Sequence, residues 1–213
     1  MNINNNMKLK GTSKISCAAM RIIISVIVCS LLLLQGCDND KYPLSETYTF
    51  SFENVEGWGG GGISLDVPLV DWTIDISDDI ASDGDYSVML YLNNIVGEGA
   101  VWIERYFNLK PNCRYNIHVE YDFASADWSD DNLWTIITSV LPDTSQIKAS
   151  YQEDTGNGAS AEYGFVWIHK SYDFIATTFS SGQLYVNIGV FGLPETARTY
   201  YIDNISITFT RYG

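Results

Sequence analysis

The chain is poor in basic residues, in histidine and in cysteine. It has 12 Lys and Arg against 26 Asp and Glu, with two histidines and four cysteines among 213 residues. So acidic a surface repels phosphate backbones and anionic lipids, which argues against nucleic-acid binding and against electrostatic adhesion to membranes. The scarcity of cysteine and histidine argues in the same way against a disulfide framework and against a zinc site.

The sequence also lacks an apolar run long enough to span a bilayer. The run Ile22–Leu34 has thirteen residues and follows four basic residues, as in a secretory signal. It ends in Leu34-Gln35-Gly36-Cys37, which resembles the lipobox of prokaryotic lipoproteins. We therefore expect residues 1–36 to be a signal peptide, Cys37 to carry a diacylglyceryl group, and residues 37–46 to be a tether. The alternative is an ordinary signal peptide in which Cys37 is incidental.

Cleavage before Cys37 would make the protein more acidic and leave it without an internal disulfide. Four of the twelve basic residues and none of the 26 acidic ones lie in the leader, so the mature chain carries a net charge of −18. Only Cys113 would keep a free thiol. The predicted location is the cell envelope, with the membrane bound through lipid on Cys37.

No window shows the 3.6-residue apolar repeat of an amphipathic helix. Short segments rich in Tyr, Val, Ile and Phe are separated instead by Gly, Asp and Asn, which predicts an all-β fold, a jelly-roll β-sandwich of two antiparallel sheets over residues 47–213. The expected strands are 47–53, 65–75, 86–93, 99–109, 113–125, 133–141, 164–178, 184–191 and 198–209. The glycine run 59–62 is expected to form a loop rather than a regular element. Residues 142–163 are expected to form a long polar loop.

The stretch Gly99–Ser125 reads as a β-hairpin around Pro111-Asn112. Alternation gives each strand one apolar face for the core. The opposite face combines aromatic with hydrogen-bonding side chains, the composition of a platform for a sugar. We predict that ligand is bound by Trp102, Glu104, Tyr106, Asn116, His118, Glu120 and Asp122. Other aromatic residues, including Tyr185, fit the core as well as a ligand surface.

Three separated motifs carry a family resemblance: Phe50-Ser51-Phe52-Glu53 followed by Trp58, the stretch Ala81–Val88, and Tyr200–Ile207. In this order they resemble the galactose-binding-like jelly rolls, in particular the carbohydrate-binding modules of xylanases and glucanases. The resemblance implies a structural Ca²⁺ held by Glu53 and Asp203, with no organic cofactor. It also implies that sugar is bound either on the concave sheet or in loops at one edge.

Catalysis is weighed against binding at Glu120-Tyr121-Asp122-Phe123, which resembles the E-x-D-x-E strand of retaining β-glucanases. The third carboxylate is missing, because Ala124 stands in its place. We therefore expect no catalytic residue and a non-catalytic lipoprotein that binds a neutral oligo- or polysaccharide. The alternatives are a structural or adhesive module that binds protein and, less favoured, a glycosidase or a lyase using His118. Enzymes or transport proteins of the envelope are candidate partners.

Overall fold

The computed structural model describes residues 41–54, 56–66, 68–93, 97–126, 134–143, 151–155, 164–193 and 197–212. Within these ranges the backbone forms eleven strands and no helix. The strands are β1 (Ser45–Phe50), β2 (Gly59–Ile63), β3 (Asp71–Ser77), β4 (Ser87–Asn93), β5 (Gly99–Asn108), β6 (Arg114–Ala126), β7 (Trp134–Leu141), β8 (Tyr151–Asp154), β9 (Phe165–Thr177), β10 (Gln183–Gly192) and β11 (Arg198–Arg211). A helix able to cross a membrane is likewise not found in the described part of the chain.

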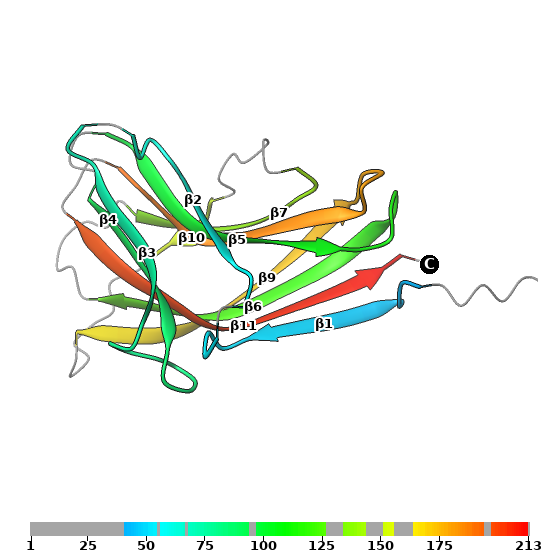
Figure 1. Cartoon of the computed structure of the whole chain (residues 1–213), viewed down its shortest axis with the longest axis horizontal. Coiled ribbons are helices and arrows are strands. Elements are labelled where there is room, and N and C mark those ends of the chain that lie inside the picture. The colour runs from blue at the N-terminus through cyan, green and yellow to red at the C-terminus, as the bar shows by residue number, and fades with distance from the viewer. Residues whose placement is uncertain are drawn as a thin grey trace, which may run out of the picture. The chain divides into compact units, whose positions relative to one another are not determined.

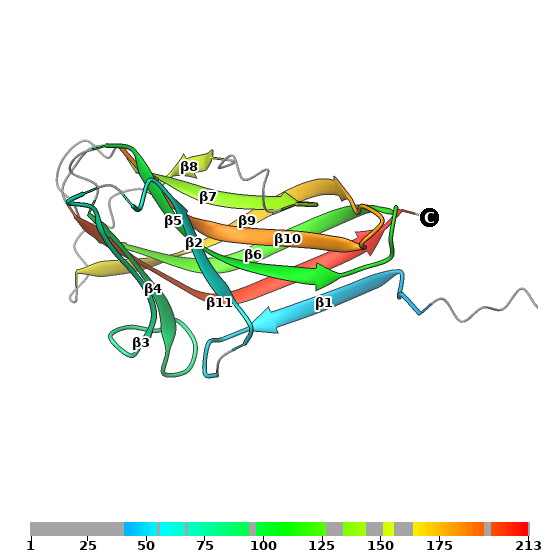
Figure 2. The same ribbon diagram turned by 45° about the horizontal axis from the view of Figure 1, so that its top comes forward.

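The strands form two antiparallel sheets that pack face to face (Figure 1). One sheet has the order β3-β4-β11-β6-β9, with β1 also paired to β11, and the other has the order β2-β5-β10-β7-β8. The predicted jelly-roll β-sandwich is therefore confirmed. The edge strands β2 and β3 belong to different sheets, and Figure 2 shows them at the same edge of the sandwich.

The core lies between the sheets and follows the predicted alternation. Val101, Ile103 and Phe107 of β5 are buried there, opposite residues such as Val119 and Phe123 of β6. Burial of so many apolar side chains is the main stabilising term for a chain whose Cys113, the one cysteine in the described residues, is a free thiol packed against the core. The core also holds a hydrogen bond of 2.6 Å between Tyr121 Oη and Thr138 Oγ1.

The predicted hairpin of residues 99–125 is wrong. Strand β5 pairs with β2 and β10, whereas β6 pairs with β9 and β11, so the two consecutive strands lie in opposite sheets. The turn is as expected, with Asn112 at φ 52°, and it is tied to a neighbouring loop by a 2.7 Å bond from Leu109 N to Gly182 O. Alternation shows which side chains meet the core, but strands facing each other across a core alternate in the same way as paired ones.

The glycine run is also not a loop. Gly59–Ile63 forms β2 and pairs with residues 104–100 of β5. Both faces of this strand lie close to neighbouring side chains: a Cβ on Gly61 would lie 2.7 Å from Trp102 Nε1, and one on Gly60 would make a tight contact of 3.0 Å with Ile74 Cδ1. The close approach of neighbouring side chains thus outweighs the low strand propensity of glycine.

Candidate functional site

The seven predicted ligand-binding residues do not share a surface. Those of β5 lie on the outer face of the five-stranded sheet, and those of β6 lie on the outer face of the six-stranded sheet. The core separates the two groups. The prediction that these residues form a single ligand platform is therefore wrong, because β5 and β6 lie in different sheets and do not form a hairpin.

On the five-stranded sheet, the outer face is built from cross-strand rows. Trp102 lies between Gly61 of β2 and Gly189 of β10, and the row continues to Ile137 of β7. Trp102 is only 4% exposed and packs in a small apolar cluster with Ala100, Ile137 and Phe191. Its expected role as an exposed stacking platform is therefore wrong, because the bare backbone of two glycines lets the indole settle onto the sheet.

The other half of this face is open. Tyr106 is 53% exposed and lies directly opposite Tyr185 of β10, with ring centroids 6.0 Å apart and planes inclined at 51°. Their neighbours on this face are Glu104 and Gln183, and Tyr185 Oη donates a long hydrogen bond of 3.5 Å to Gln183 Oε1. We call these four residues the tyrosine surface. In Figures 1 and 2 the sheet bends so that its outer face lies on the inside of the curve.

Next to the tyrosine surface is a row of polar side chains. Glu104 lies opposite Asn187, and Asn187 lies opposite Ser139. The Asn187 amide is fully buried, and its Nδ2 donates to Ser139 Oγ at 3.3 Å, while its Oδ1 has no partner within the described part of the chain. Glu104 Oε2 accepts a bond of 3.3 Å from Trp102 Nε1, which aims the carboxylate along the sheet. Tyr185, Asn187 and Ser139 were not predicted as ligand-binding residues, because β7 and β10 are distant from β5 in sequence. The available signal was the period-two alternation, which places these odd-numbered residues on one face of their strands.

On the opposite surface, β6 and β9 carry a chain of paired charges. His118 bridges two carboxylates, with Nδ1 2.8 Å from Asp173 Oδ1 and Nε2 3.1 Å from Glu120 Oε1. His169 continues the chain, with Nε2 3.7 Å from the same Glu120 oxygen and Nδ1 3.0 Å from Asp122 Oδ1. We call these five residues the histidine ladder. Each member has a partner within the ladder, so this surface satisfies its own polar groups.

The pKa shifts follow from these contacts. Hydrogen bonds to Asp173 and then to Glu120 raise the pKa of His118. Burial alone would raise the pKa of Asp122, but hydrogen bonds from His169, Ser82 and Asn204 outweigh it and lower that pKa. Both shifts favour the charged forms, as expected of a structural ion-pair network.

The two predicted calcium ligands hold a loop. Asp203 is fully buried, and its Oδ2 accepts from the backbone N–H groups of Ser82 and Asp83 at 2.8 and 3.0 Å. Glu53 Oε1 accepts from Asp85 N at 2.7 Å and Tyr86 N at 3.1 Å. Because N–H donors occupy these oxygens, the arrangement does not fit a cation as it stands. No group of three or more His, Cys, Asp or Glu side chains suited to a metal ion is found in the described ranges.

Two further predictions are placed as follows. Cys37 lies outside the described residues. Glu120 and Asp122, considered as glycosidase carboxylates, are engaged in the histidine ladder, and Asp122 Oδ2 also accepts from Ser82 Oγ at 2.8 Å.

No family model matches this sequence, and no curated protein matches it either. Solved structures with a similar fold include the carbohydrate-binding module TmCBM27, described as recognising mannan, which is 19% identical with a TM-score of 0.47 over 81% of this chain and 99% of its own. The CBM22-1 xylan-binding domain of Paenibacillus barcinonensis Xyn10C is 14% identical with a TM-score of 0.42, over 78% and 95%. The K1 cleaved adhesin domain of Lys-gingipain from Porphyromonas gingivalis W83 is 16% identical with a TM-score of 0.47, over 76% and 97%. Structural neighbours of this chain are thus carbohydrate-binding modules with a jelly-roll fold, together with an adhesin domain.

Proposed function

We propose that this protein is a non-catalytic, lipid-anchored protein of the cell envelope that binds a neutral oligo- or polysaccharide on the tyrosine surface. The observation that carries the proposal is the contact between the exposed ring of Tyr106 and the half-buried ring of Tyr185 on directly paired strands. Rings held by a sheet lose little entropy on binding and offer apolar faces to a sugar ring. The sheet curvature gives an extended ligand a concave bed (Figure 1).

Selection among sugars would come from the polar groups beside the rings. Glu104 and Gln183 supply acceptors and donors for hydroxyl groups, and a carboxylate forms stronger hydrogen bonds than a neutral acceptor. A sugar that lacks the matching hydroxyl leaves these groups desolvated and unpaired, which is costly. The net charge of −18 expected for the mature chain favours neutral over anionic polysaccharides.

The proposal is tested by glycan-array binding with the intact protein, followed by titration calorimetry on the best glycan. Tyr106→Ala should weaken binding about tenfold or more, because a stacked ring contributes about 1.5–3 kcal/mol through burial. The matched control is Tyr212→Ala, since Tyr212 is 44% exposed beside Asn116 on the other sheet. Equal losses in the two variants, or no glycan bound at all, would reject the tyrosine surface.

The adhesive alternative predicts a different pattern. A surface that binds protein would retain its partner in the presence of soluble glycans. Capture of a protein from an envelope extract that Tyr106→Ala abolishes and excess glycan leaves unchanged would favour that alternative.

A further inference from the structure

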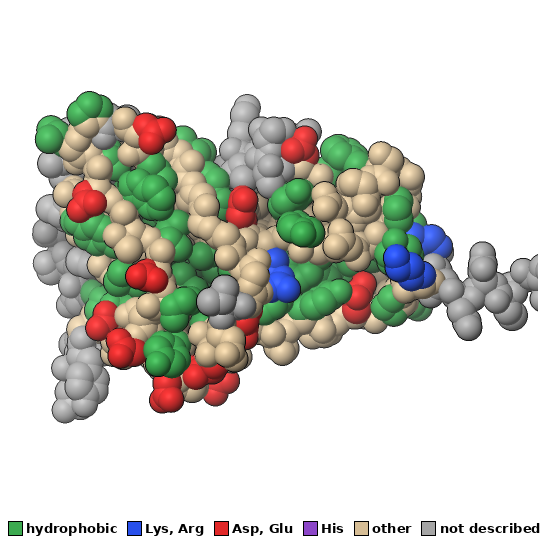
Figure 3. Space-filling view, in the orientation of Figure 1, with side chains coloured by type: hydrophobic (Ala, Val, Ile, Leu, Met, Phe, Trp, Pro, Cys, Tyr) green, Lys and Arg blue, Asp and Glu red, His purple; other side chains and the backbone are tan. Residues whose placement is uncertain are grey.

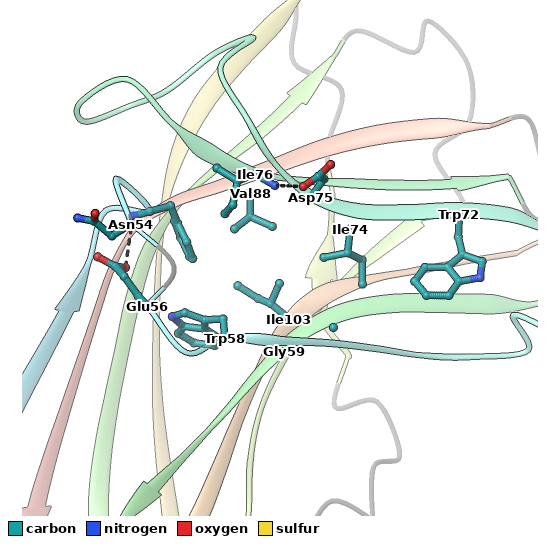
Figure 4. A pocket seen from close by; sticks show the side chains of 12 residues that line it. Asn54, Glu56, Trp58, Gly59, Trp72, Ile74, Asp75, Ile76, Val88 and Ile103 are labelled. Carbon is teal, nitrogen blue, oxygen red and sulfur yellow. Dashed lines mark hydrogen bonds between the residues drawn. The ribbon is translucent and has the colours of Figure 1, made fainter.

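A cavity of about 410 Å³ opens at the edge of the sandwich, between β2 and β3. We call it the edge cavity. Its floor is made by Val88 and Ile103, which belong to the core and come from opposite sheets (Figure 4). The space-filling view shows apolar side chains crowded over this part of the molecule, with acidic groups around them (Figure 3). Its volume lies within the range of small-molecule sites, about 300–1,000 Å³.

The glycine run forms one wall of this cavity. Trp72, Ile74 and Ile76 pair in register with the core residues of β4, so they point to the inner side of their sheet. Across from them, Gly60 lets β2 lie close to Ile74, since a Cβ there would lie 3.0 Å from Ile74 Cδ1. Trp72 is 42% exposed and Ile76 is 41% exposed although both face inward, so the sandwich is open over these two side chains.

One end of the cavity is polar. Trp58 Nε1 is buried and has no hydrogen-bond partner among the described residues, and in Figure 4 it lies on the side nearest Glu56. An indole N–H is a donor only, so it requires an acceptor such as a hydroxyl oxygen. Glu56 Oε2 accepts from Phe52 N at 3.3 Å, and Phe52 itself is held at φ 60°. A bulky residue in the left-handed region is strained, and such strain clusters at ligand sites.

The charges of the lining select the ligand. The described residues that line the edge cavity include two carboxylates, Glu56 and Asp75, and no Lys or Arg. A carboxylate or phosphate head group would therefore be placed near like charges, because the Arg105 guanidinium, which lies beside Gly57, does not line the cavity. A hydroxylated head group could accept from the indole and donate to the carboxylate, while an apolar chain fills the space between Trp72 and Ile103.

We propose that the edge cavity is a second ligand site, separate from the tyrosine surface, that binds the apolar portion of a neutral, hydroxylated amphiphile. The chain lies against Trp72, Ile74 and Ile103, and the head lies at Trp58 and Glu56. This site does not depend on glycan binding by the tyrosine surface.

The test uses titration calorimetry of the intact protein with probes kept below their critical micelle concentrations. The probes are n-octyl β-D-glucopyranoside, octanoate and methyl β-D-glucopyranoside. Octyl glucoside should bind to the edge cavity. Octanoate should bind about tenfold more weakly because its head group is charged, and the methyl glycoside should not bind there because it has no apolar chain.

Two neighbouring glycines provide a matched pair of variants. Gly60→Val adds a side chain that faces the cavity and should weaken octyl glucoside binding about tenfold or more. The backbone of Gly59 also lines the cavity, but Gly59→Val adds its side chain on the other face of β2, beside Glu104, and should leave that binding unchanged. If Gly60→Val unfolds, Trp72→Ala tests the same wall at a half-exposed position. Glu56→Gln should strengthen octanoate binding.

The proposal is overturned if octyl glucoside does not bind, or if octanoate binds equally well. It is also overturned if the two glycine variants bind alike and Trp72→Ala has no effect. Tyr106→Ala should leave octyl glucoside binding intact and Gly60→Val should leave glycan binding intact, so failure of one site is distinguishable from failure of the other.

Discussion

The two outer faces of this sandwich carry similar kinds of residues and arrange them differently. On the six-stranded sheet, two histidines and three carboxylates pair with one another along β6 and β9. On the five-stranded sheet, Tyr106 is half exposed and Asn187 Oδ1 has no hydrogen-bond partner in the ranges that the structure describes. A polar group that is already paired within its surface has less to gain from a ligand. The comparison therefore favours the five-stranded face for binding and gives the histidine ladder a stabilising role.

Trp102 offers the strongest test of this comparison, because it lies on the same outer face as Tyr106 but is buried. Trp102→Ala should lower the free energy of unfolding by about 3–5 kcal/mol, the usual cost of removing a buried Trp or Phe ring. Tyr106→Ala, on the same strand, should cost far less stability and more affinity. Chemical denaturation of both variants measures the difference. A Trp102→Ala protein as stable as the wild type would mean that the closed half of the face is open.

Asp203 separates a loop-holding role from the calcium site that the family resemblance implies. Asp203→Ala should cost about 3 kcal/mol or more, because buried N–H donors of residues 82 and 83 lose their acceptor. We expect this loss to persist in the presence of a chelator. A calcium site would instead add about 2.7 kcal/mol to the wild type at a free calcium concentration of about a hundred times Kd. Unfolding in calcium and in chelator decides between these two roles.

Gly61 tests whether Trp102 is closed down by the glycine strand. Gly61→Ala should destabilise the protein by about 1–3 kcal/mol, because its Cβ would lie 2.7 Å from the Trp102 indole nitrogen. Gly59→Ala is the control, since a Cβ there meets nothing closer than 3.8 Å. The measurement is the midpoint of thermal unfolding of the two variants. Similar midpoints would show that the indole can move away at no cost.

The histidine ladder should give the smallest effect. The folded-state pKa of His118 is raised above its ordinary value of 6.5, so its stabilisation is complete below pH 6.5 and is lost as the pH rises through the folded-state pKa. The contribution should stay below about 1 kcal/mol, because the pair is partly exposed to solvent. His118→Gln should flatten the fall in unfolding midpoint above pH 6.5 and leave glycan affinity unchanged. A large loss of glycan affinity would assign binding to the six-stranded face instead.

The fold class and the core-facing side of each strand could be predicted from local sequence patterns. Period-two alternation identified the core faces of β5 and β6, and Pro111-Asn112 marked the turn between them. The strand ends were less well predicted. The first strand was expected to reach Glu53 but ends at Phe50, because Phe52 adopts a positive φ.

Only the tertiary structure decided which surfaces these faces form. Alternation looks the same whether the next strand pairs within the sheet or lies across the core. The sequence therefore could not show that Tyr106 lies on the same surface as Tyr185 and not on the same surface as His118. The glycine run reads locally as a loop, and only the indole on one side and Ile74 on the other explain it as a strand. Pairing between distant segments depends on the packing of the whole sandwich, and that packing produced the tyrosine surface, the buried Trp102 and the edge cavity.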